Sequence, residues 1–205
     1  MEGEPVEVYE VRDVEGDDFV VTTESPYGDV SPGQFVQVGL DVDGVRVVRH
    51  YTLSNSHPED ELEFTVELDP EGELSPRLRE LDAGDTVYVA GPFGRSYYED
   101  EDAVTVVVGG PGVGPAVGIA ERALERDADV AVVYEDETHA HVDRLRDVEK
   151  RGGHVSLVDA SGLESAVAEA LGEVDGQAFV YGFSGFVDRA LAALGDVDAK
   201  VERFD

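Results

Sequence analysis

The chain has 205 residues and 41% of them are hydrophobic, so it can form one large or two small domains around a buried core. Its 15 Lys and Arg against 47 Asp and Glu give a formal net charge of −32, which disfavours nucleic acids and anionic membranes as partners. The absence of Cys excludes disulfides, zinc–thiolate sites and an iron–sulfur cluster ligated by this chain.

The first half of the sequence has the two-residue periodicity of short strands. The pattern predicts strands over residues 6–11, 19–23, 34–40, 45–53, 62–68 and 86–90. The pair Asp43-Gly44 indicates a tight hairpin between the third and fourth of these. One short helix is expected over residues 75–81, with Ser75 as its N-cap and Pro76 as its first helical residue. Such a series of strands is typical of an antiparallel barrel or sandwich.

The second half alternates strands with helices after a polar, acidic linker at residues 97–102. We expect strands over residues 104–108, 130–134, 155–158, 178–181 and 197–204. Helices are expected over residues 115–126, 140–151, 163–171 and 186–194. This alternation predicts a doubly wound parallel sheet. The chain is therefore expected to form two domains, residues 1–98 and 103–205.

The acidic residues are spread along the whole chain, and only two residues are Lys. Such a surface repels itself in dilute buffer, whereas molar salt screens the repulsion. We therefore expect a protein adapted to a salt-rich cytoplasm, with an ordinary acidic protein as the alternative. The N-terminal residues lack a basic region followed by an apolar run, and the longest apolar stretches are strand-sized. A cytoplasmic protein without a membrane span is the prediction.

The segment Arg49-His50-Tyr51-Thr52-Leu53-Ser54 combines groups that suit a flat heterocycle bearing phosphates. An Arg can hold a diphosphate with a bidentate fork. Tyr51 lies on the same face of a strand as Arg49 and offers a flat ring with a hydroxyl. Thr52 and Ser54 supply hydroxyls that can reach a ring nitrogen or carbonyl. Taken alone, six residues of this kind also fit an ordinary barrel strand.

Two further segments could bind phosphate groups. Gly72-Glu73-Leu74-Ser75 opens the short helix, where backbone N–H groups can attract an anion, although a simple N-cap is the commoner use of Ser. Gly109-Gly110-Pro111-Gly112-Val113-Gly114 lies between the first strand and the first helix of the second half. Its glycines would let the backbone approach a pyrophosphate, with a tight structural turn as the alternative.

Two segments follow later strands at the same predicted sheet edge, where open α/β folds bind ligands. Tyr181-Gly182-Phe183-Ser184 comes after the fourth strand, and its aromatic residues could instead pack a domain interface. Glu135 follows the second strand in Tyr134-Glu135-Asp136-Glu137. Carboxylates there would repel a 2′-phosphate and accept hydrogen bonds from ribose hydroxyls. A dinucleotide bound there is expected to lack a 2′-phosphate.

These segments, in this order, resemble the ferredoxin–NADP reductase superfamily over nearly the whole chain. Arg49-His50-Tyr51-Thr52 is similar to its flavin motif, and Gly72 with Ser75 is similar to its diphosphate-binding segment, which favours FAD over FMN. The glycine turn is similar to its pyridine-nucleotide pyrophosphate loop. The ending Glu202-Arg203-Phe204 is similar to an acidic and aromatic ending whose ring covers the flavin.

The resemblance implies a six-stranded Greek-key β-barrel that binds FAD, followed by an α/β domain that binds NAD(P)H. Hydride would pass from NAD(P)H to FAD, with NADH preferred over NADPH because of the carboxylates after the second strand. Electrons would pass on to a separate acceptor, of which a ferredoxin-like protein is one candidate. Arg49 would pair with the diphosphate, Tyr51 would lie against the flavin ring, and Thr52 would bond near flavin N5. Tyr181, Gly182, Phe183 and Phe204 would lie on the nicotinamide side, with Gly110, Gly112 and Val113 at the pyrophosphate.

The sequence departs from the family pattern at three positions in the second half. Pro111 replaces a Thr or Ser, Tyr181 replaces a Cys, and Phe183 replaces a Pro. These departures motivate an alternative, a non-catalytic flavin- or nucleotide-binding subunit that retains the fold. A metal site at His139 and His141 is not expected, because residues two apart on a helix point to different faces.

Overall fold

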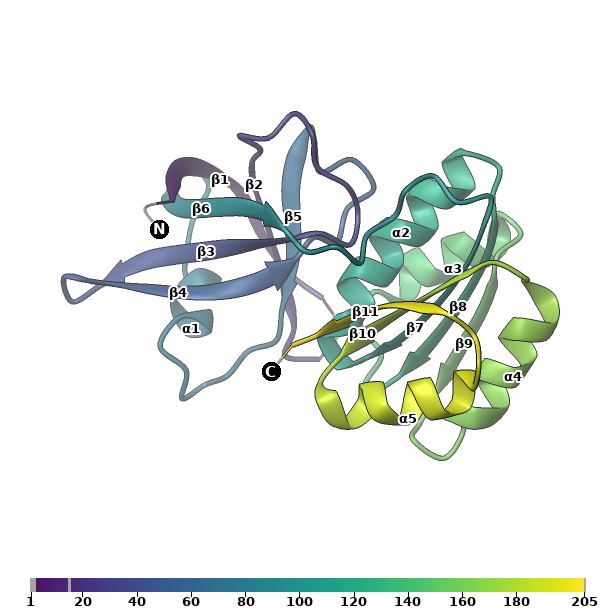
Figure 1. Ribbon diagram of the computed structural model, residues 1–205. Coiled ribbons are helices and arrows are strands. Elements are labelled where there is room, and N and C mark those ends of the chain that lie inside the picture. The colour runs from purple at the N-terminus through teal and green to yellow at the C-terminus, as the bar shows by residue number, and fades with distance from the viewer. Residues whose placement is uncertain (1–2, 15, 205) are drawn as a thin grey trace.

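The computed structural model describes residues 3–14 and 16–204, which form two sheets that meet near the middle of the molecule (Figure 1). The first sheet is antiparallel, with the strand order β4-β3-β6-β1-β2-β5. Its strands are β1 (Glu4–Asp13), β2 (Phe19–Glu24), β3 (Phe35–Val42), β4 (Val45–Thr52), β5 (Glu61–Val66) and β6 (Thr86–Phe93). The crossovers from β2 to β3 and from β5 to β6 are those of a Greek key.

The two edges of this sheet meet, which closes it into a barrel. Leu53, just after β4, forms an antiparallel bridge with Phe64 of β5. The backbone N–H of Ser54 donates to the carbonyl of Glu63 at 2.8 Å. Alternate strand residues fill the interior, including Phe19, Leu62 and Phe64, and the short helix α1 (Ser75–Arg79) caps it with Leu78.

The second sheet is parallel, with the strand order β11-β10-β7-β8-β9. Its strands are β7 (Ala103–Gly109), β8 (Asp129–Glu135), β9 (His154–Val158), β10 (Gln177–Gly182) and β11 (Ala199–Arg203). A 3₁₀ turn, η1 (Gly110–Gly112), precedes α2 (Val113–Glu125). The other helices are α3 (Val142–Lys150), α4 (Leu163–Glu173) and α5 (Ser184–Leu194).

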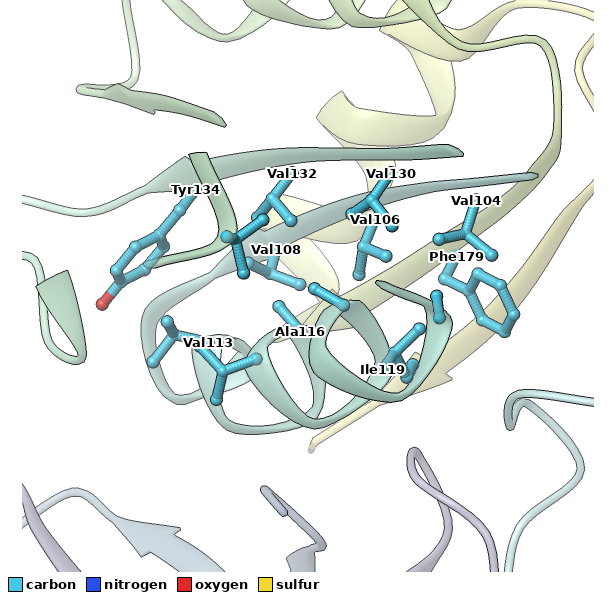
Figure 2. Packing of buried hydrophobic residues seen from close by; sticks show 14 of the residues in the cluster. Val104, Val106, Val108, Val113, Ala116, Ile119, Val130, Val132, Tyr134 and Phe179 are labelled. Carbon is cyan, nitrogen blue, oxygen red and sulfur yellow. The ribbon is translucent and has the colours of Figure 1, made fainter. Parts of the chain in front are cut away.

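Both faces of this sheet are covered, which explains the continuous apolar run of β7. Val106 and Val108 pack with Ala116 and Ile119 of α2, as Figure 2 shows. Val107 points to the opposite face and packs under α4 and α5. A strand buried on both faces has no polar alternation, so the run is a consequence of the helices on each side.

The chain order creates a switch point at β7. The chain runs from β7 outward to β8 and β9, then returns to β10 and β11 on the other side of β7. The carboxyl ends of β7 and β10 are therefore neighbours from which the two connecting segments diverge, and this is where open α/β sheets bind ligands. Figure 1 shows the end of β11 reaching the junction with the barrel.

The predicted fold class is confirmed, and the differences lie at the ends of elements. The first helix of the second half begins at Val113 rather than at Pro115. Ser75 is the first residue of α1 instead of its N-cap, which is Leu74. The Ser75 hydroxyl accepts from the N–H of Asp69 at 3.0 Å, so it closes the preceding loop rather than the helix end.

The boundary between residues 98 and 103 stays a prediction, and it falls between the last strand of the first sheet and the first strand of the second.

In the part of the chain that the structure describes, no helix has both the length and the apolar character needed to cross a membrane.

Candidate active site

A cavity of about 710 Å³ lies at the junction of the barrel and the parallel sheet. The barrel contributes the end of β4, the end of β5 and the loop after it, while the other half contributes η1, the segment after β10 and the end of β11. Its lining residues are Phe35, His50, Tyr51, Thr52, Thr65, Glu67, Leu68, Asp69, Pro70, Pro111, Phe183, Glu202, Arg203 and Phe204.

Tyr51 and Thr52 reach the cavity because they are the last two residues of β4. The Tyr51 ring stacks on Phe64, with ring centroids 5.1 Å apart and an interplanar angle of 24°. Burial raises the pKa of Tyr51 to about 12, so its hydroxyl remains protonated and can donate a hydrogen bond at neutral pH. His50 lies at the rim, with its Nε2 atom 3.0 Å from the side-chain nitrogen of Gln37.

Arg49 lies close to the segment before α1, and the binding of a diphosphate between them stays a prediction. The exposed Arg49 guanidinium has its Nη2 atom 3.9 Å from the carboxylate of Glu73. Leu74 is buried in the barrel core, and the Ser75 hydroxyl is bonded to Asp69. The side chains of Leu74 and Ser75 therefore fix this segment, and the Arg49 guanidinium is the group that reaches outward.

The other half of the molecule contributes two aromatic rings, Phe183 and Phe204. They meet edge to face, with centroids 6.2 Å apart and an interplanar angle of 86°. The N–H of Phe204 donates to the carbonyl of Gly182 at 3.1 Å, which extends the pairing of β11 with β10. Arg203 holds the same end through Asp188 at 2.8 Å. Burial raises the pKa of Glu202, which also lines the cavity.

The glycine turn lies next to the cavity through Pro111. A Cβ on Gly112 would lie 2.5 Å from the carbonyl oxygen of Tyr181, so only Gly lets the turn approach β10 this closely. Gly109 packs against the ring of Phe186 in the same way. Val113 is buried, and its N–H donates back to the carbonyls of Gly110 and Pro111, while Pro111 is the residue of the turn that lines the cavity.

The structure contradicts the expectation that Tyr181 places its side chain beside the nicotinamide. The Tyr181 ring is fully buried, and it is stacked parallel to Phe179 with centroids 6.4 Å apart. Its hydroxyl donates to the carbonyl of Ser96 between the two sheets, and burial raises its pKa. Tyr181 and Phe179 are two residues apart on β10, so both point to the α2 face of the sheet and away from the cavity.

The predicted residues Leu53, Ser54 and Gly114 also lie outside the cavity. Leu53 is fully buried in the barrel, and Ser54 is buried with its hydroxyl 3.0 Å from Glu63. A Cβ on Gly114 would lie 3.1 Å from the hydroxyl of Thr65 and 3.3 Å from Ser54, so Gly114 forms the junction between the halves. These residues form the ends of the flavin and glycine segments, where the chain has already turned away from the cavity.

Thr65 is a cavity residue that the sequence did not single out. It lies between Phe64 and Val66 on β5, and the alternating pattern there places its side chain on the face opposite Phe64. That pattern was visible in the sequence, but the meeting of β5 with the end of β4 was not. Thr65 also bonds across the junction to His141, with its hydroxyl 2.8 Å from Nε2.

Glu135 lies at the end of β8, where the sequence predicted contact with a nucleotide ribose. Arg189 of α5 donates to one of its carboxylate oxygens. The other oxygen, Oε2, is buried and has no hydrogen-bond partner among residues 3–14 and 16–204. Over the same residues, no cluster of His, Asp or Glu has the arrangement of a metal site.

The comparisons agree with this architecture. Residues 11–98 match the family described as an oxidoreductase FAD-binding domain. The chain is 31% identical over 166 residues to a flavodoxin/ferredoxin–NADP reductase of Shigella flexneri, covering 76% of this chain and 67% of that one. It is 38% identical over 108 residues to a glycine betaine monooxygenase reductase subunit of Chromohalobacter salexigens, covering 50% and 29%.

A solved structure shares the fold at low sequence identity. The ferredoxin–NADP⁺ reductase of Neisseria gonorrhoeae, with bound FAD and NADP, has a TM-score of 0.82 and 15% identity, and each chain is covered completely. The match to the FAD-binding family and the similarity to reductases define the class as flavin-binding oxidoreductases. The chain belongs to the ferredoxin–NADP reductase superfamily, and it is an FAD-containing reductase that uses NAD(P)H.

The residues at the cavity fit FAD. A volume of about 710 Å³ is within the usual range for cofactor sites of roughly 300–1,000 Å³. The donor set combines a flat wall at Tyr51, a hydroxyl at Thr52 and an outward guanidinium at Arg49, which match a ring system, its polar edge and a diphosphate. The cofactor expected from the sequence is therefore consistent with the chemistry of the site.

Proposed function

We propose that this protein oxidises NADH in preference to NADPH and passes the electrons to a separate redox protein. The observation that carries the proposal is the shared cavity, which Tyr51 and Thr52 line from the barrel and Phe183 and Phe204 line from the parallel sheet. Bound FAD supplies the hydride-accepting and electron-donating chemistry that no side chain of the protein has. The protein's task is to align two flat rings.

On the barrel side, three residues would hold the flavin. Tyr51 is fixed by its stack on Phe64 and would form a flat wall for the ring system. Thr52 would present its hydroxyl to the polar edge of the ring. Arg49 would exchange its distant Glu73 partner, at 3.9 Å, for the diphosphate, because a bidentate bond to phosphate is stronger than an exposed ion pair at that distance.

On the other side, the backbone and two rings would receive the nucleotide. Gly110 and Gly112 would offer the turn backbone to the pyrophosphate, near the start of α2. Phe204 would cover the flavin face and give way to the nicotinamide. Phe183 is 48% exposed and touches Phe204 edge to face, so both rings would move when the nucleotide enters.

The preference for NADH rests on the surroundings of Glu135. Its Oε2 atom has no hydrogen-bond partner among the described residues and would accept a hydrogen bond from a ribose hydroxyl once nucleotide entry uncovers it. Arg189 is the nearby cation that could meet a 2′-phosphate, but it is engaged with Glu135. Asp136 and Glu137 follow directly, so a 2′-phosphate would enter a region rich in carboxylates.

The acceptor is proposed to be a separate redox protein. The chain has no Cys, so it cannot hold an iron–sulfur cluster with its own thiolates. The relatives include reductases named for flavodoxin, ferredoxin and a monooxygenase. Several barrel cations are already paired with carboxylates, such as Arg46 with Asp41 and Arg79 with Asp13. Docking of an acidic acceptor would therefore need salt to screen the net charge of −32.

An anaerobic titration of the FAD-loaded protein with NADH, and separately with NADPH, in molar salt tests the proposal. Loss of the flavin absorption band at about one equivalent of NADH is expected. The Thr52→Val variant should keep FAD but be reduced more slowly, whereas Thr86→Val, at an exposed site on β6, should match the wild type. A spectrum unchanged by both nucleotides would indicate the non-catalytic alternative, and faster reduction by NADPH would refute the nucleotide preference.

A further inference from the structure

A second polar cluster lies between the two halves of the protein, outside the cavity. Its centre is Arg144 of α3, whose side chain is largely buried. Two guanidinium nitrogens donate to the carboxylate of Glu121 on α2, both at 2.7 Å. The remaining bonds cross to the barrel, to the carboxylate of Glu63 and to the backbone carbonyl of Ser54, both at 2.8 Å. One side chain thus joins α2, α3, β5 and the end of the flavin motif.

The electrostatics of the cluster keep Arg144 charged. Burial lowers the pKa of Arg144, but the hydrogen bonds and charges of Glu121 and Glu63 outweigh burial and raise it overall. Glu63 has a second, more distant cation in Arg12, at 3.7 Å. Removal of the Arg144 charge would leave the sheltered carboxylates of Glu121 and Glu63 without their main cation. Leaving a buried charge unpaired in this way costs more stability than replacing the whole ion pair.

The cluster is connected to the flavin segment through the backbone. Ser54 follows Thr52 by two residues, and Leu53 between them donates its N–H to the carbonyl of Gln34 at 2.9 Å. The barrel therefore fixes this segment from one side, and Arg144 fixes it from the other. The cavity residue Thr65 is tied to the start of α3 through His141, at 2.8 Å.

Helix α2 closes the same junction by direct backbone packing. A Cβ on Gly118 would lie 2.9 Å from the carbonyl oxygen of Asn55 and 3.1 Å from the carbonyl carbon of Ser54. Gly114, one turn earlier, packs against Ser54 and Thr65. The segment after Thr52 is thus enclosed by α2 and by the Arg144 side chain, which leaves little freedom for one half to shift against the other.

We propose that Arg144 is a positioning residue for hydride transfer, because it fixes the separation between a flavin held at Tyr51 and Thr52 and a nicotinamide delivered by the parallel sheet. The inference rests on the proposed function of the cavity. Arg144 acts through Ser54 and Glu63 and touches neither ring. Misplacement of reacting groups by about 1 Å can slow an enzyme about 100-fold, so a clamp at the junction can govern the rate without contact with the cofactor.

The test compares Arg144→Met and Arg144→Lys with a matched control, Arg146→Met. Arg146 lies two residues further along α3, with a side chain 63% exposed and paired only with Asp143 among the described residues. Flavin reduction by NADH is measured in stopped flow, and FAD affinity by fluorescence. The chain has no Cys, so spin labels at Thr86→Cys and Ala192→Cys report the separation of the halves by pulsed electron paramagnetic resonance, without FAD.

Arg144→Met should bind FAD with an affinity within about threefold of the wild type, because Arg49 and Tyr51 are unchanged, yet be reduced about 10- to 100-fold more slowly. Its distribution of label distances should broaden. Arg144→Lys should have a reduction rate between those of the wild type and Arg144→Met, since an ammonium group cannot bond to Glu121 and to the barrel in the way a guanidinium does. Arg146→Met should match the wild type.

A wild-type reduction rate in Arg144→Met overturns the inference, and so does a slower rate with an unchanged distance distribution. If Arg144→Met does not fold, the reduction rate and the distance distribution of Arg144→Lys are compared with those of the wild type instead. A wild-type protein that neither NADH nor NADPH reduces refutes the proposed function instead. In that case the label distances still show whether Arg144 holds the two halves together.

Discussion

Replacement of Gly118 by Ala should destabilise the protein, although Ala is the better helix former. In an open helix interior, Gly→Ala stabilises by about 0.5–1 kcal/mol. At Gly118 the new Cβ would lie 2.9 Å from Asn55 O, 3.1 Å from Ser54 C and 3.2 Å from Asn55 C. All three atoms are backbone, so no side chain can rotate away, and such overpacking costs about 1–3 kcal/mol. The net expectation is a loss of about 1 kcal/mol.

Gly172 of α4 provides the matched control. A Cβ there would meet no atom within 4 Å, so Gly172→Ala should show the helix-propensity gain alone, at most about 1 kcal/mol because the site is near the helix end. Urea unfolding of both variants at one fixed salt concentration gives the two differences. The two changes in the free energy of unfolding should have opposite signs, and the dependence of that free energy on urea concentration should stay the same. A Gly118→Ala variant as stable as Gly172→Ala would refute the argument that α2 contacts the barrel backbone this closely.

Two further variants probe charges at the junction. Burial lowers the pKa of His141 to about 4, so the folded state binds fewer protons and stability present above pH 6.5 is lost as pH falls towards 4. Between pH 7 and pH 4 the wild type should therefore lose about 3 kcal/mol of stability that His141→Asn does not lose, as measured by thermal melts at both pH values. The same pH dependence in the variant and the wild type would contradict the prediction. Burial raises the pKa of Asp18 to about 6, which adds stability as pH falls, but equally in both proteins. Lys200 bonds Glu101 at 2.5 Å and Glu99 at 2.7 Å with a side chain 19% exposed, so Lys200→Met should cost about 1–3 kcal/mol in urea unfolding. Lys150→Met, at a 73% exposed site, should change stability by less than about 0.5 kcal/mol, and equal losses would refute the distinction.

The sequence predicted the arrangement of strands and helices because periodicity reflects which faces are buried. The alternating residues of β5 and the continuous valines of β7 each encode how many faces of the strand are covered. Boundaries were less predictable where a side chain had two possible partners. Ser75 can cap a helix or close a loop, and its bond to Asp69 is visible only once the loop is folded.

The candidate site was predictable as segments but less so as side chains. Tyr51 and Thr52 line the cavity and Arg49 has its guanidinium near Glu73, whereas Tyr181 is buried on the α2 face of β10. A motif gives the path of the backbone, but the side-chain direction depends on the register of that strand against its neighbours. Thr65 was missed for a related reason, since its place in the cavity follows from the closure of the barrel between β4 and β5.

The burial of particular ion pairs predicts that salt affects the surface of a chain of net charge −32 more than its internal geometry. In molar salt the Debye length is about 3 Å, so exposed pairs such as Arg146–Asp143, with side chains 63% and 89% exposed, lose most of their attraction. The pair Arg144–Glu63 is only 22% and 14% exposed and is screened much less. Salt therefore relieves repulsion across the acidic surface, while the sheltered pair between the two halves retains its strength. The separation of the two halves should then vary little over the salt range in which overall stability varies most.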